Sequence, residues 1–243
     1  MAEATPKPWS HAPPVESHEV TAALSSNVIS PPQRVLLTVC LEFDGVGKEL
    51  RTVDLLRAAD AMLGLYDLMF PSGGQVPTLL KNDHLNHIKQ VRAAMEKAAE
   101  HETALARDFV RSSLRTHGRD KARKDWGTGV LGLLWIARTF GFIGRFLALV
   151  EDPATQPYKA ARDAYGEVLR PYHTLVVSMV VRVALGLVGS RDNLRANFGM
   201  PTDEATTLYM ARTGQSMRRV FEELMVLLNE EDVNFPDAVG IMG

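Results

Sequence analysis

The longest apolar stretch of this chain, residues 129–150, contains two arginines, Arg138 and Arg145. Its 22 residues are enough to cross a bilayer as a helix, but two cations inside a membrane span are costly. A second apolar stretch, 175–189, has only 15 residues and also contains a cation, Arg182. We therefore interpret both stretches as buried helices of a soluble bundle, with 129–150 as its central element.

Helical periodicity continues through most of the chain after residue 33. Residues 50–70 carry apolar side chains every three or four positions, which places one apolar stripe on a helix. No segment shows sustained alternation of apolar and polar residues, so the sequence predicts an all-α domain of about seven or eight helices in two layers. Further helices are expected over about 78–95, with Thr78 as N-cap and Leu79 on the apolar side, over 101–116, over 157–189 with a break at Pro171, and from Thr202 to about 231.

The first 33 residues differ in composition from the rest of the chain. They hold nearly half of its thirteen prolines and no long apolar run, which is typical of an extended tail. We expect a tail over 1–33, which acts as a spacer or binds a protein partner through its Pro-Pro pairs, and one domain over 34–243. A transit peptide avoids acidic residues, so Glu3, Glu16 and Glu19 argue against one.

Charge and cysteine content limit the classes of function. The 27 Lys and Arg nearly balance the 29 Asp and Glu, so no overall positive field recruits nucleic acid. The single cysteine, Cys40, excludes an intrachain disulfide and suits a reducing compartment, so a cytoplasmic location is expected. The sequence has no glycine-rich phosphate-binding loop, which removes the commonest nucleotide-binding folds, and no cofactor is expected.

One predicted helix carries a polar face. Its members are spaced i, i+3, i+4 and i+7 and are Asp83, Asn86, His87 and Gln90. The simplest interpretation is a solvated helix surface with an Asp-His pair. A metal ion between Asp83 and His87 is an alternative, but the companion ligands that zinc motifs supply at fixed spacing are missing, so no metal site is predicted.

The two arginines of the central apolar helix need partners, because an unpaired buried charge is costly. In one interpretation each arginine pairs with a carboxylate of another helix, and Trp135 belongs to the core. In the other, Trp135 is an aromatic platform and Arg138 donates hydrogen bonds to an anionic or hydroxyl-rich ligand. The residues alone leave both interpretations open, and also whether Arg145 pairs internally or faces a ligand.

His173 follows the Pro171 break, at the start of an apolar helix. A histidine in such a place is more often structural than catalytic. An enzyme that uses Asp83, His87 and His173 as acid-base groups is an alternative. No nucleophile motif accompanies these residues, so enzymatic activity is not expected.

Four segments, in this order, resemble the glycolipid transfer protein superfamily. They are the helix at 52–67, the stretch from Lys81 through Asp83 to Ile88, the helix from Trp135 through Arg138 with its Phe-Ile and Phe-Leu pairs, and the pair Tyr172-His173. The resemblance covers about residues 34–235. It implies an all-α, two-layer helical sandwich of about eight helices that encloses a lipid-binding hydrophobic pocket, and a non-enzymatic carrier that moves one sphingolipid between membranes.

The resemblance also implies roles for three residues. Asp83 would accept hydrogen bonds from the sphingosine amide and the sugar hydroxyls, and His173 would donate to the ceramide acyl carbonyl. Trp135 would stack under the first sugar ring. Such a division suits the ligand, because each buried CH2 group of the two chains contributes about 0.8 kcal/mol while the polar residues select the head group.

The sequence departs from the family pattern at several positions. The glycolipid-binding members of the family carry Asn and Lys where this chain has His87 and Gln90. Asn86 could take the place of the family's Asn only if the helix were rotated. Leu175 stands where the family often has an interfacial Trp, so transient membrane contact would use other exposed apolar groups. Phe235 stands where the family has a Tyr that closes the head-group site, and it lacks the hydroxyl.

Two head groups fit the expected site. The ceramide-1-phosphate branch of the superfamily has Arg in place of Trp135 and more cations around the phosphate, whereas Thr139, one turn later in this chain, is neutral. A glycosphingolipid is therefore favoured over ceramide-1-phosphate. In the phosphate alternative, Arg138 and a protonated His87 would hold the head group. A sphingolipid sensor that uses the tail is a further alternative.

Overall fold

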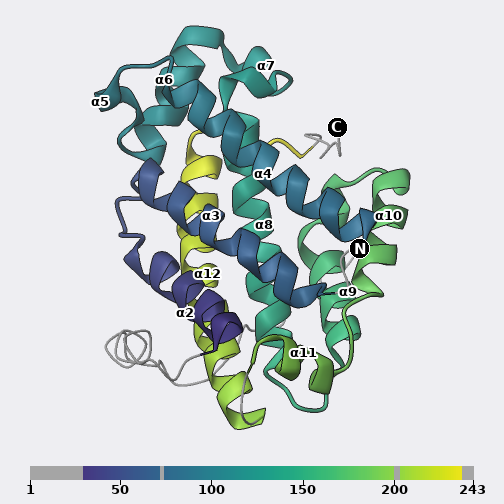
Figure 1. Ribbon diagram of the computed structural model, residues 1–243. Helices are drawn as coiled ribbons and strands as arrows, with labels where there is room; N and C mark the ends of the chain where they lie inside the picture. Colours follow the sequence, from purple (N-terminus) through teal and green to yellow (C-terminus); the bar gives the residue numbers. More distant parts are fainter. Residues whose placement is uncertain (1–29, 72–73, 200–202, 237–243) are drawn as a thin grey trace.

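The computed structural model describes residues 30–71, 74–199 and 203–236, and this part of the chain is all-α, as the sequence predicts (Figure 1). It contains eleven α-helices, two short 3₁₀ helices and no strand. Short helices at chain turns, which periodicity does not reveal, make the number larger than expected. The elements are α2 (Pro31–Gly45), α3 (Thr52–Met69), α4 (Gln75–Met95), α5 (Glu100–Thr103), α6 (Ala106–His117), α7 (Arg119–Ala122), η1 (Trp126–Thr128), α8 (Val130–Val150), α9 (Pro157–Val168), η2 (Arg170–Tyr172), α10 (Leu175–Leu185), α11 (Arg191–Asn197) and α12 (Asp203–Glu230).

Helix α8 is the central element, as predicted. Every residue in it except Ala148 and Leu149 is buried, including both arginines. It is the one helix in the described part that is long and apolar enough to cross a membrane, yet 89% of its most apolar window is buried inside the protein. Neighbouring helices therefore take the place that lipid would occupy around a membrane span.

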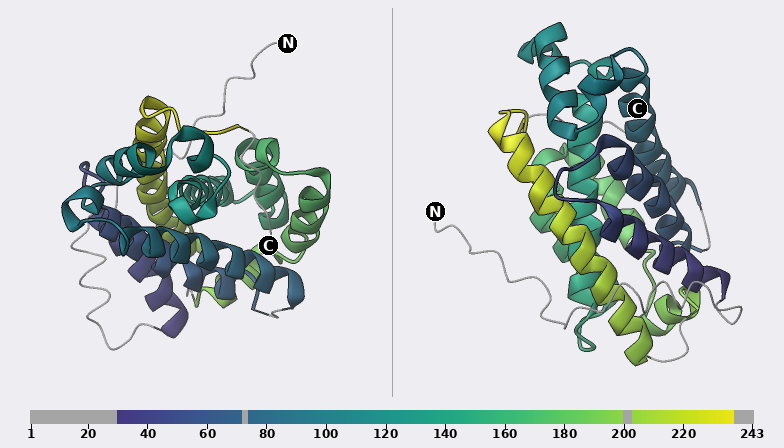
Figure 2. Two further views of the ribbon diagram at one scale, coloured as in Figure 1. Left: turned by 90° about the horizontal axis from the view of Figure 1, so that it is seen from above. Right: turned by 90° about the vertical axis from the view of Figure 1, so that its left-hand side faces the viewer.

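The helices form two layers, as expected. Helices α2, α3 and α4 make one layer, and α8, α9 and α12 make the other (Figures 1 and 2). The layers meet where α2 packs on α12 and where α4 packs on α8. Phe43 of α2 contacts Phe140 of α8 edge to face, with ring centroids 4.7 Å apart. This dry apolar contact holds the layers together.

The first helix begins slightly earlier than the sequence predicts. Helix α2 starts at Pro31, and the Ser30 side chain accepts from the Gln33 backbone N–H, while the Gln33 side chain accepts from the Ser30 backbone N–H at 2.9 Å. This capping box and the proline in the first turn explain why a helix begins inside the predicted tail of 1–33. Residues 1–29 lie outside the described residues, as does the predicted N-cap Thr202.

The start of α4 corrects a second expectation. The helix begins at Gln75, so Thr78 is not its N-cap; the Thr78 hydroxyl instead donates to the Gly74 carbonyl at 2.8 Å. Pro77 does not prevent this earlier start, because N–H groups in the first turn have no partner within the helix. Leu79, expected on the apolar side, is 45% exposed. Ile88 and Val91, expected on the same side, are buried, so the expectation fails only near the start of the helix.

The helix expected over 101–116 is divided into α5 and α6. Between them, the Ala104 carbonyl accepts from the Thr52 N–H at 3.0 Å, and the Ala106 N–H donates to the Leu50 carbonyl at 2.9 Å. These long-range bonds replace helical ones at the break. The break expected at Pro171 is confirmed, because α9, η2 and α10 follow one another there.

Helix α10 was expected to be buried, and this expectation is wrong for one of its faces. It lies at the edge of the molecule, packed on α9 and α4 (Figure 1), so only its inner face is covered. Leu175, at its start, is 85% exposed. The other large apolar side chains exposed on α10 and just after it are Val176, Met179, Val183 and Leu187.

Candidate functional site

Five aromatic or imidazole rings lie side by side at one end of α8. Their neighbouring centroids are 5.3, 6.1, 5.2 and 5.6 Å apart, and the first three pairs of planes deviate by only 11°, 21° and 14°. Five separate segments contribute them, so the run exists only in the folded protein. In order the rings are Trp126 of η1, His87 of α4, Trp135 of α8, His173 after η2 and Tyr165 of α9.

Close backbone packing places the first three rings. A Cβ atom on Gly132 of α8 would lie 2.8 Å from the His87 carbonyl oxygen, so glycine lets α4 approach α8 closely. Trp126 is held by η1, in which the Asp125 side chain accepts from the Gly127 N–H at 2.8 Å. The turn then needs glycine at Gly129, which has a φ of +75°.

The Pro171 break positions His173. His173 has an extended backbone, and the Thr174 hydroxyl accepts from the Val177 N–H to begin α10. The His173 Nδ1 atom lies 3.1 Å from the Tyr165 hydroxyl, which also donates to Ser178 at 2.9 Å. Burial, reinforced by the nearby Arg138 charge, lowers the pKa of His173 to about 4. The imidazole is therefore neutral at physiological pH.

The two buried arginines of α8 have different surroundings. Arg145 binds Glu167 of α9 with Nε 2.6 Å and Nη2 3.3 Å from the two carboxylate oxygens, which confirms the structural interpretation for this residue. The Arg138 guanidinium lies 3.6 Å from the Tyr172 ring centroid and 4.9 Å from that of Trp135. Burial lowers the pKa of Arg138 to about 10, so it stays charged at neutral pH.

Arg138 also holds the segment that follows α12. Its Nη2 atom donates to the Phe235 carbonyl at 2.6 Å and lies 3.3 Å from the Asn234 side-chain oxygen. The Phe235 ring is buried and lies 5.7 Å from the guanidinium of Arg119, which also pairs with Asp232. The two arginines therefore attach this segment beside the run of rings.

The polar face of α4 is not the solvated surface that the simplest interpretation of the sequence predicts. His87 is buried, and the Asp83 side chain is only 23% exposed. Burial raises the pKa of Asp83 to about 7 and, together with His84, lowers the pKa of His87 to about 3. At neutral pH His87 is uncharged, so its 3.8 Å contact with Asp83 is not an ion pair. Rings from η1 and α8 cover this face.

Several buried polar atoms near the rings have no hydrogen-bond partner within the described part of the chain. They are Nε1 of Trp135, Nδ1 of His87 and Oε1 of Gln90. An unpaired buried donor or acceptor costs about 1–3 kcal/mol, so such atoms mark a place where a polar ligand or water binds. Because Nε1 donates and Oε1 accepts, the set suits hydroxyl groups, which do both.

The structure thus brings together six of the seven sequence-predicted site residues in direct contacts and places Asn86 beside them. His87, Trp135, Arg138 and His173 are linked by ring contacts, and Phe235 reaches Arg138 through its carbonyl. Asp83 contacts His87. Asn86 precedes His87 on α4, is half-buried and is not part of the run of rings.

Sequence reasoning missed two contributors, Trp126 and Tyr165. The flanking Gly127 and Gly129 were a signal that Trp126 stands in a tight turn. Tyr165 had no comparable signal, because its role depends on tertiary contacts. Gln90 was placed on the polar face of its helix, but the burial of its side-chain oxygen was not foreseen.

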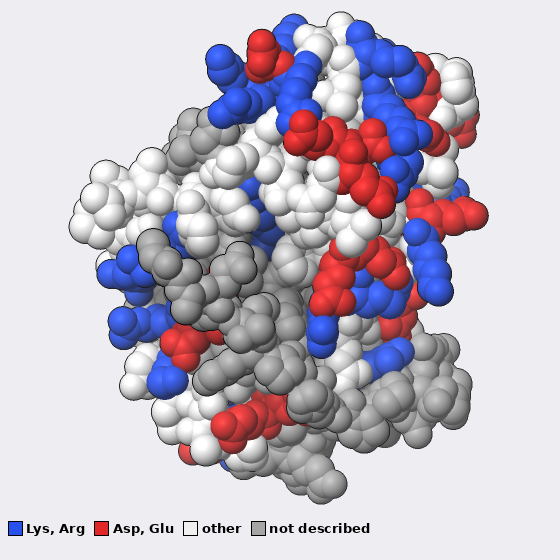
Figure 3. All heavy atoms as spheres, turned by 180° about the vertical axis from the view of Figure 1, so that it is seen from behind, with Lys and Arg blue, Asp and Glu red and all other residues white. Residues whose placement is uncertain are grey.

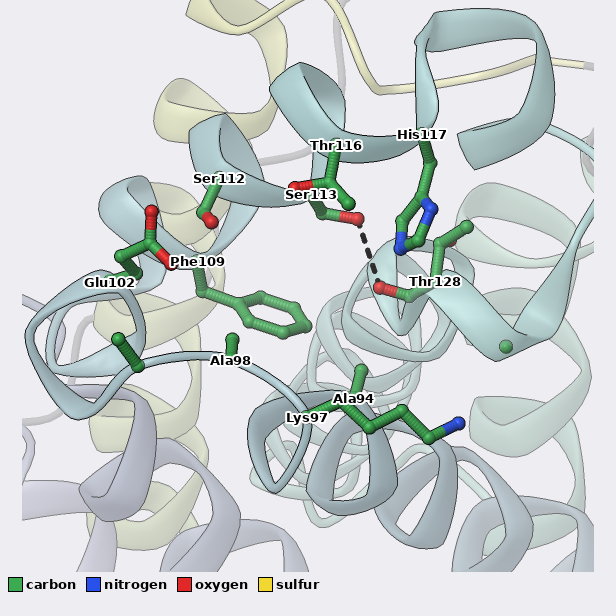
Figure 4. Close-up of a pocket in the computed structure, with 12 residues that line it drawn as sticks. Ala94, Lys97, Ala98, Glu102, Phe109, Ser112, Ser113, Thr116, His117 and Thr128 are labelled. Carbon is green, nitrogen blue, oxygen red and sulfur yellow. Dashed lines mark hydrogen bonds between the residues drawn. The ribbon is translucent and has the colours of Figure 1, made fainter.

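A second cavity, of about 220 Å³, lies between the end of α4, α6 and η1 (Figure 4). The Phe109 ring points into it, and the Ser113 hydroxyl donates to the Thr128 carbonyl across one side at 3.0 Å. None of the sequence-predicted site residues lines this cavity. Within the described ranges, no three His, Cys, Asp or Glu side chains are grouped to hold a metal ion.

Comparison with known proteins identifies a family. The family model for glycolipid transfer protein (GLTP) matches residues 50–200, which is more than half of the chain. No curated protein is detectably similar to this sequence.

Solved structures with the same fold have low sequence identity to this chain. FAPP2, which selects simple glycosphingolipids using the GLTP-fold, is 23% identical, with 78% of this chain and 90% of that chain covered and a TM-score of 0.64. HET-C2, a fungal glycolipid transfer protein, is 20% identical, with 76% and 88% covered and a TM-score of 0.65. Human ceramide-1-phosphate transfer protein, in complex with 12:0 ceramide-1-phosphate, is 16% identical, with 84% and 97% covered and a TM-score of 0.69. The fold and the match over residues 50–200 together show that this chain belongs to the glycolipid transfer protein family.

Proposed function

We propose that this protein is a cytoplasmic, non-enzymatic carrier that binds one glycosphingolipid and moves it between membranes. The observation that carries the proposal is the run of rings around Trp135, with Asp83 beside it and unpartnered donor and acceptor atoms in its walls. Family membership supports the lipid ligand, because the related structures include proteins that bind or select sphingolipids.

The chemistry of the site favours a sugar over a phosphate. A sugar presents C–H faces to aromatic rings and hydroxyl groups to mixed donors and acceptors. The sequence left a protonated His87 as a phosphate ligand, but burial lowers its pKa to about 3, so it carries no charge at neutral pH. Arg138 is already engaged with Tyr172 and the Phe235 carbonyl. A phosphate would therefore have to compete for a cation whose donors are already engaged.

In this proposal three residues bind the ceramide and the first sugar. The Asp83 carboxylate accepts from the amide N–H and from sugar hydroxyls. When the Tyr165 hydroxyl turns its single proton from Ser178 to Nδ1 of His173, and the Ser178 hydroxyl donates to Tyr165 in return, the neutral imidazole carries its proton on Nε2, which can then donate to the acyl carbonyl. Trp135 is 2% exposed and packs against both His87 and His173, so a sugar stacks on it after one of these rings moves.

Transient membrane contact is assigned to the exposed apolar face of α10. This face begins at Leu175, two residues after His173, so it lies close to where the lipid enters. Apolar side chains on a surface helix can enter the boundary between head groups and acyl chains. Leu175 occupies the position at which the family often has Trp and can take over its role.

The proposal is tested by transfer between vesicles, with labelled glucosylceramide and labelled ceramide-1-phosphate measured side by side. We expect glucosylceramide to move and intact-complex mass spectrometry to show one lipid per protein. Lipid extracted after incubation should be chemically unchanged. Transfer of ceramide-1-phosphate alone would overturn the head-group assignment, and chemical conversion of the lipid would overturn the carrier function.

A further inference from the structure

A basic cavity, distinct from the one between α4, α6 and η1, lies outside the head-group site. It measures about 460 Å³ and is formed by α9, η2 and α10. This volume lies within the range of small-ligand sites, about 300–1,000 Å³. Its charged and aromatic lining includes Lys159, Arg162, Asp163, Tyr165, Arg170 and Arg182.

The three arginines of this cavity have no ion-pair partner in the described part of the chain. Lys159 pairs with Asp163 at 3.0 Å, which leaves Arg162, Arg170 and Arg182 without a side-chain hydrogen bond or ion pair. Three cations that surround one cavity without bound carboxylates repel each other, and an anion removes that repulsion.

In another charged region of the surface, by contrast with this cavity, the arginines are paired with carboxylates. Arginines of α6 and α7 pair with acidic residues at the end of α12, as Arg107 does with Glu230 and Glu231. Seen from behind, positive and negative side chains alternate at the upper end of the molecule, whereas basic groups border an uncharged protrusion along the margin of α9 and α10 (Figure 3). At this margin, by contrast, three arginines without ion pairs line one cavity.

The basic cavity adjoins the apolar face of α10. Arg182 lies on α10, three residues after Met179 and one before Val183, and all three side chains are exposed. Apolar side chains that enter a bilayer would bring Arg182 to the level of the lipid phosphates, where arginine binds well. The overall charge of −2 provides no general attraction to anionic membranes, so local cations decide the preference.

We propose that this cavity binds the phosphate head group of an anionic phospholipid in the membrane on which the protein docks. The inference rests on the proposed membrane contact of α10. Tyr165 connects it to the head-group site, because this residue lines the cavity and its hydroxyl contacts His173. An occupied cavity thus lies one side chain away from the residue assigned to the ceramide carbonyl.

The test uses vesicles of phosphatidylcholine with or without phosphatidylserine, and the full-length chain. The variant Arg170→Gln/Arg182→Gln removes two cations from the cavity. The control Arg57→Gln/Arg92→Gln removes two exposed cations from α3 and α4, so the net charge is the same. We expect the cavity variant to bind phosphatidylserine vesicles about ten- to thirtyfold more weakly, because each cation near an anionic surface contributes about 1 kcal/mol.

The control variant should lose much less binding, and glucosylceramide transfer between phosphatidylcholine vesicles should be unchanged in both. Equal loss in the two variants would reduce the effect to net charge and overturn the cavity site. Tight binding of soluble inositol phosphate to the cavity, without vesicles, would overturn the membrane assignment. Arg170→Lys/Arg182→Lys keeps the charge and should recover most of the binding, which distinguishes lost attraction from a damaged fold.

The two proposals fail in different ways. If the wild-type protein transfers no glycolipid but shows binding that depends on Arg170 and Arg182, the carrier function is wrong and the anionic site stands. If transfer occurs and phosphatidylserine has no effect on vesicle binding, the carrier function stands and the cavity site is wrong.

Discussion

Arg138 and Arg145 lie seven residues apart on α8, both fully buried, yet they serve different ends of the molecule. Arg145 has a carboxylate partner, Glu167 of the neighbouring helix. Arg138 contacts the faces of Tyr172 and Trp135 and the carbonyl of Phe235. Arg145 is thus a structural residue, because a neighbouring helix provides its carboxylate. Arg138 instead belongs to the candidate site, because it holds aromatic rings and the segment after α12 in place.

The surroundings of the two residues differ in the same way. Around Arg145 the apolar side chains of α8 and α12 are well buried, and the guanidinium itself is bound by Glu167. Around Arg138 several buried polar atoms have no partner within the described residues, among them Nε1 of Trp135. The buried cation at one end of α8 thus has a carboxylate partner, while the atoms around the other are arranged to receive a polar ligand.

The largest effect is expected from Asp83→Val, which acts at the ligand-binding end only. A hydrogen bond to a charged group contributes about 1.5–3 kcal/mol, so glucosylceramide transfer should fall about ten- to hundredfold. Thermal unfolding should be unchanged or occur at higher temperature, because a poorly solvated carboxyl group is removed. The exposed Asp67→Val is the matched control. An unfolded Asp83→Val protein would show that Asp83 is structural.

Trp135 tests whether one ring serves both the core and the ligand. Trp135→Ala should reduce transfer strongly and also destabilise the fold by about 3–5 kcal/mol, because a large buried ring is lost. Trp135→Phe keeps an aromatic face and should retain part of the transfer with a smaller loss of stability. If Trp135→Phe lowers the melting temperature but leaves transfer at the wild-type rate, the platform role has to be abandoned.

Glu167→Gln should have the opposite profile, because it acts at the structural end of α8. Breaking a fully buried ion pair costs about 3–5 kcal/mol, but Glu167 is 41% exposed, so we expect about 1–2 kcal/mol. The melting temperature should fall, while transfer per folded molecule stays at the wild-type level. A selective loss of transfer would mean that Arg145 faces the lipid after all.

A smaller effect is expected of pH on the stability of the fold, and its sign is opposite for the carboxyl group of Asp83 and the imidazole of His87. Burial raises the pKa of Asp83 from 3.8 to about 7, so the unfolded chain releases this proton first and stability falls between about pH 4 and 7. Burial lowers the pKa of His87 from 6.5 to about 3, so the unfolded chain takes up this proton first. Stability is then lost as the pH drops below about 6.5.

Thermal unfolding as a function of pH separates these contributions. The melting temperature of Asp83→Asn should rise by a few degrees relative to the wild type as the pH rises from about 4 to 8. The melting temperature of His87→Gln should rise relative to the wild type as the pH falls from about 7 to 4. Parallel curves for a variant and the wild type would show that the residue is not buried in the way described.

The predictability of the fold depended on how regular each segment is. Residues 130–150 are apolar nearly all round, which requires neighbours on every side and correctly predicted the central helix. The start of α4 was missed because Thr78 resembles an N-cap while the real start depends on how Gly74 ends the preceding turn. The break between α5 and α6 depends on bonds to residues 50–52, which no local pattern encodes.

For the candidate site, residue types were easier to predict than environments. Trp135, Arg138 and His173 stand out in the sequence because a large ring and charged or titratable groups interrupt apolar runs. The polar side of α4 was interpreted as solvated, since spacing shows which residues share a face but not what covers it. Trp126 and Tyr165 joined the site only through contacts between separate segments.

By itself, the sequence determined the all-helical class, the central buried helix, the break at Pro171 and the family resemblance, because these follow from local propensity and from residues in a fixed order. The tertiary structure alone decided that Arg145 meets Glu167, that His87 is buried and uncharged, and that α10 leaves an apolar face exposed beside unpaired cations. Burial and pKa are properties of what surrounds a side chain, and those surroundings come from distant parts of the chain.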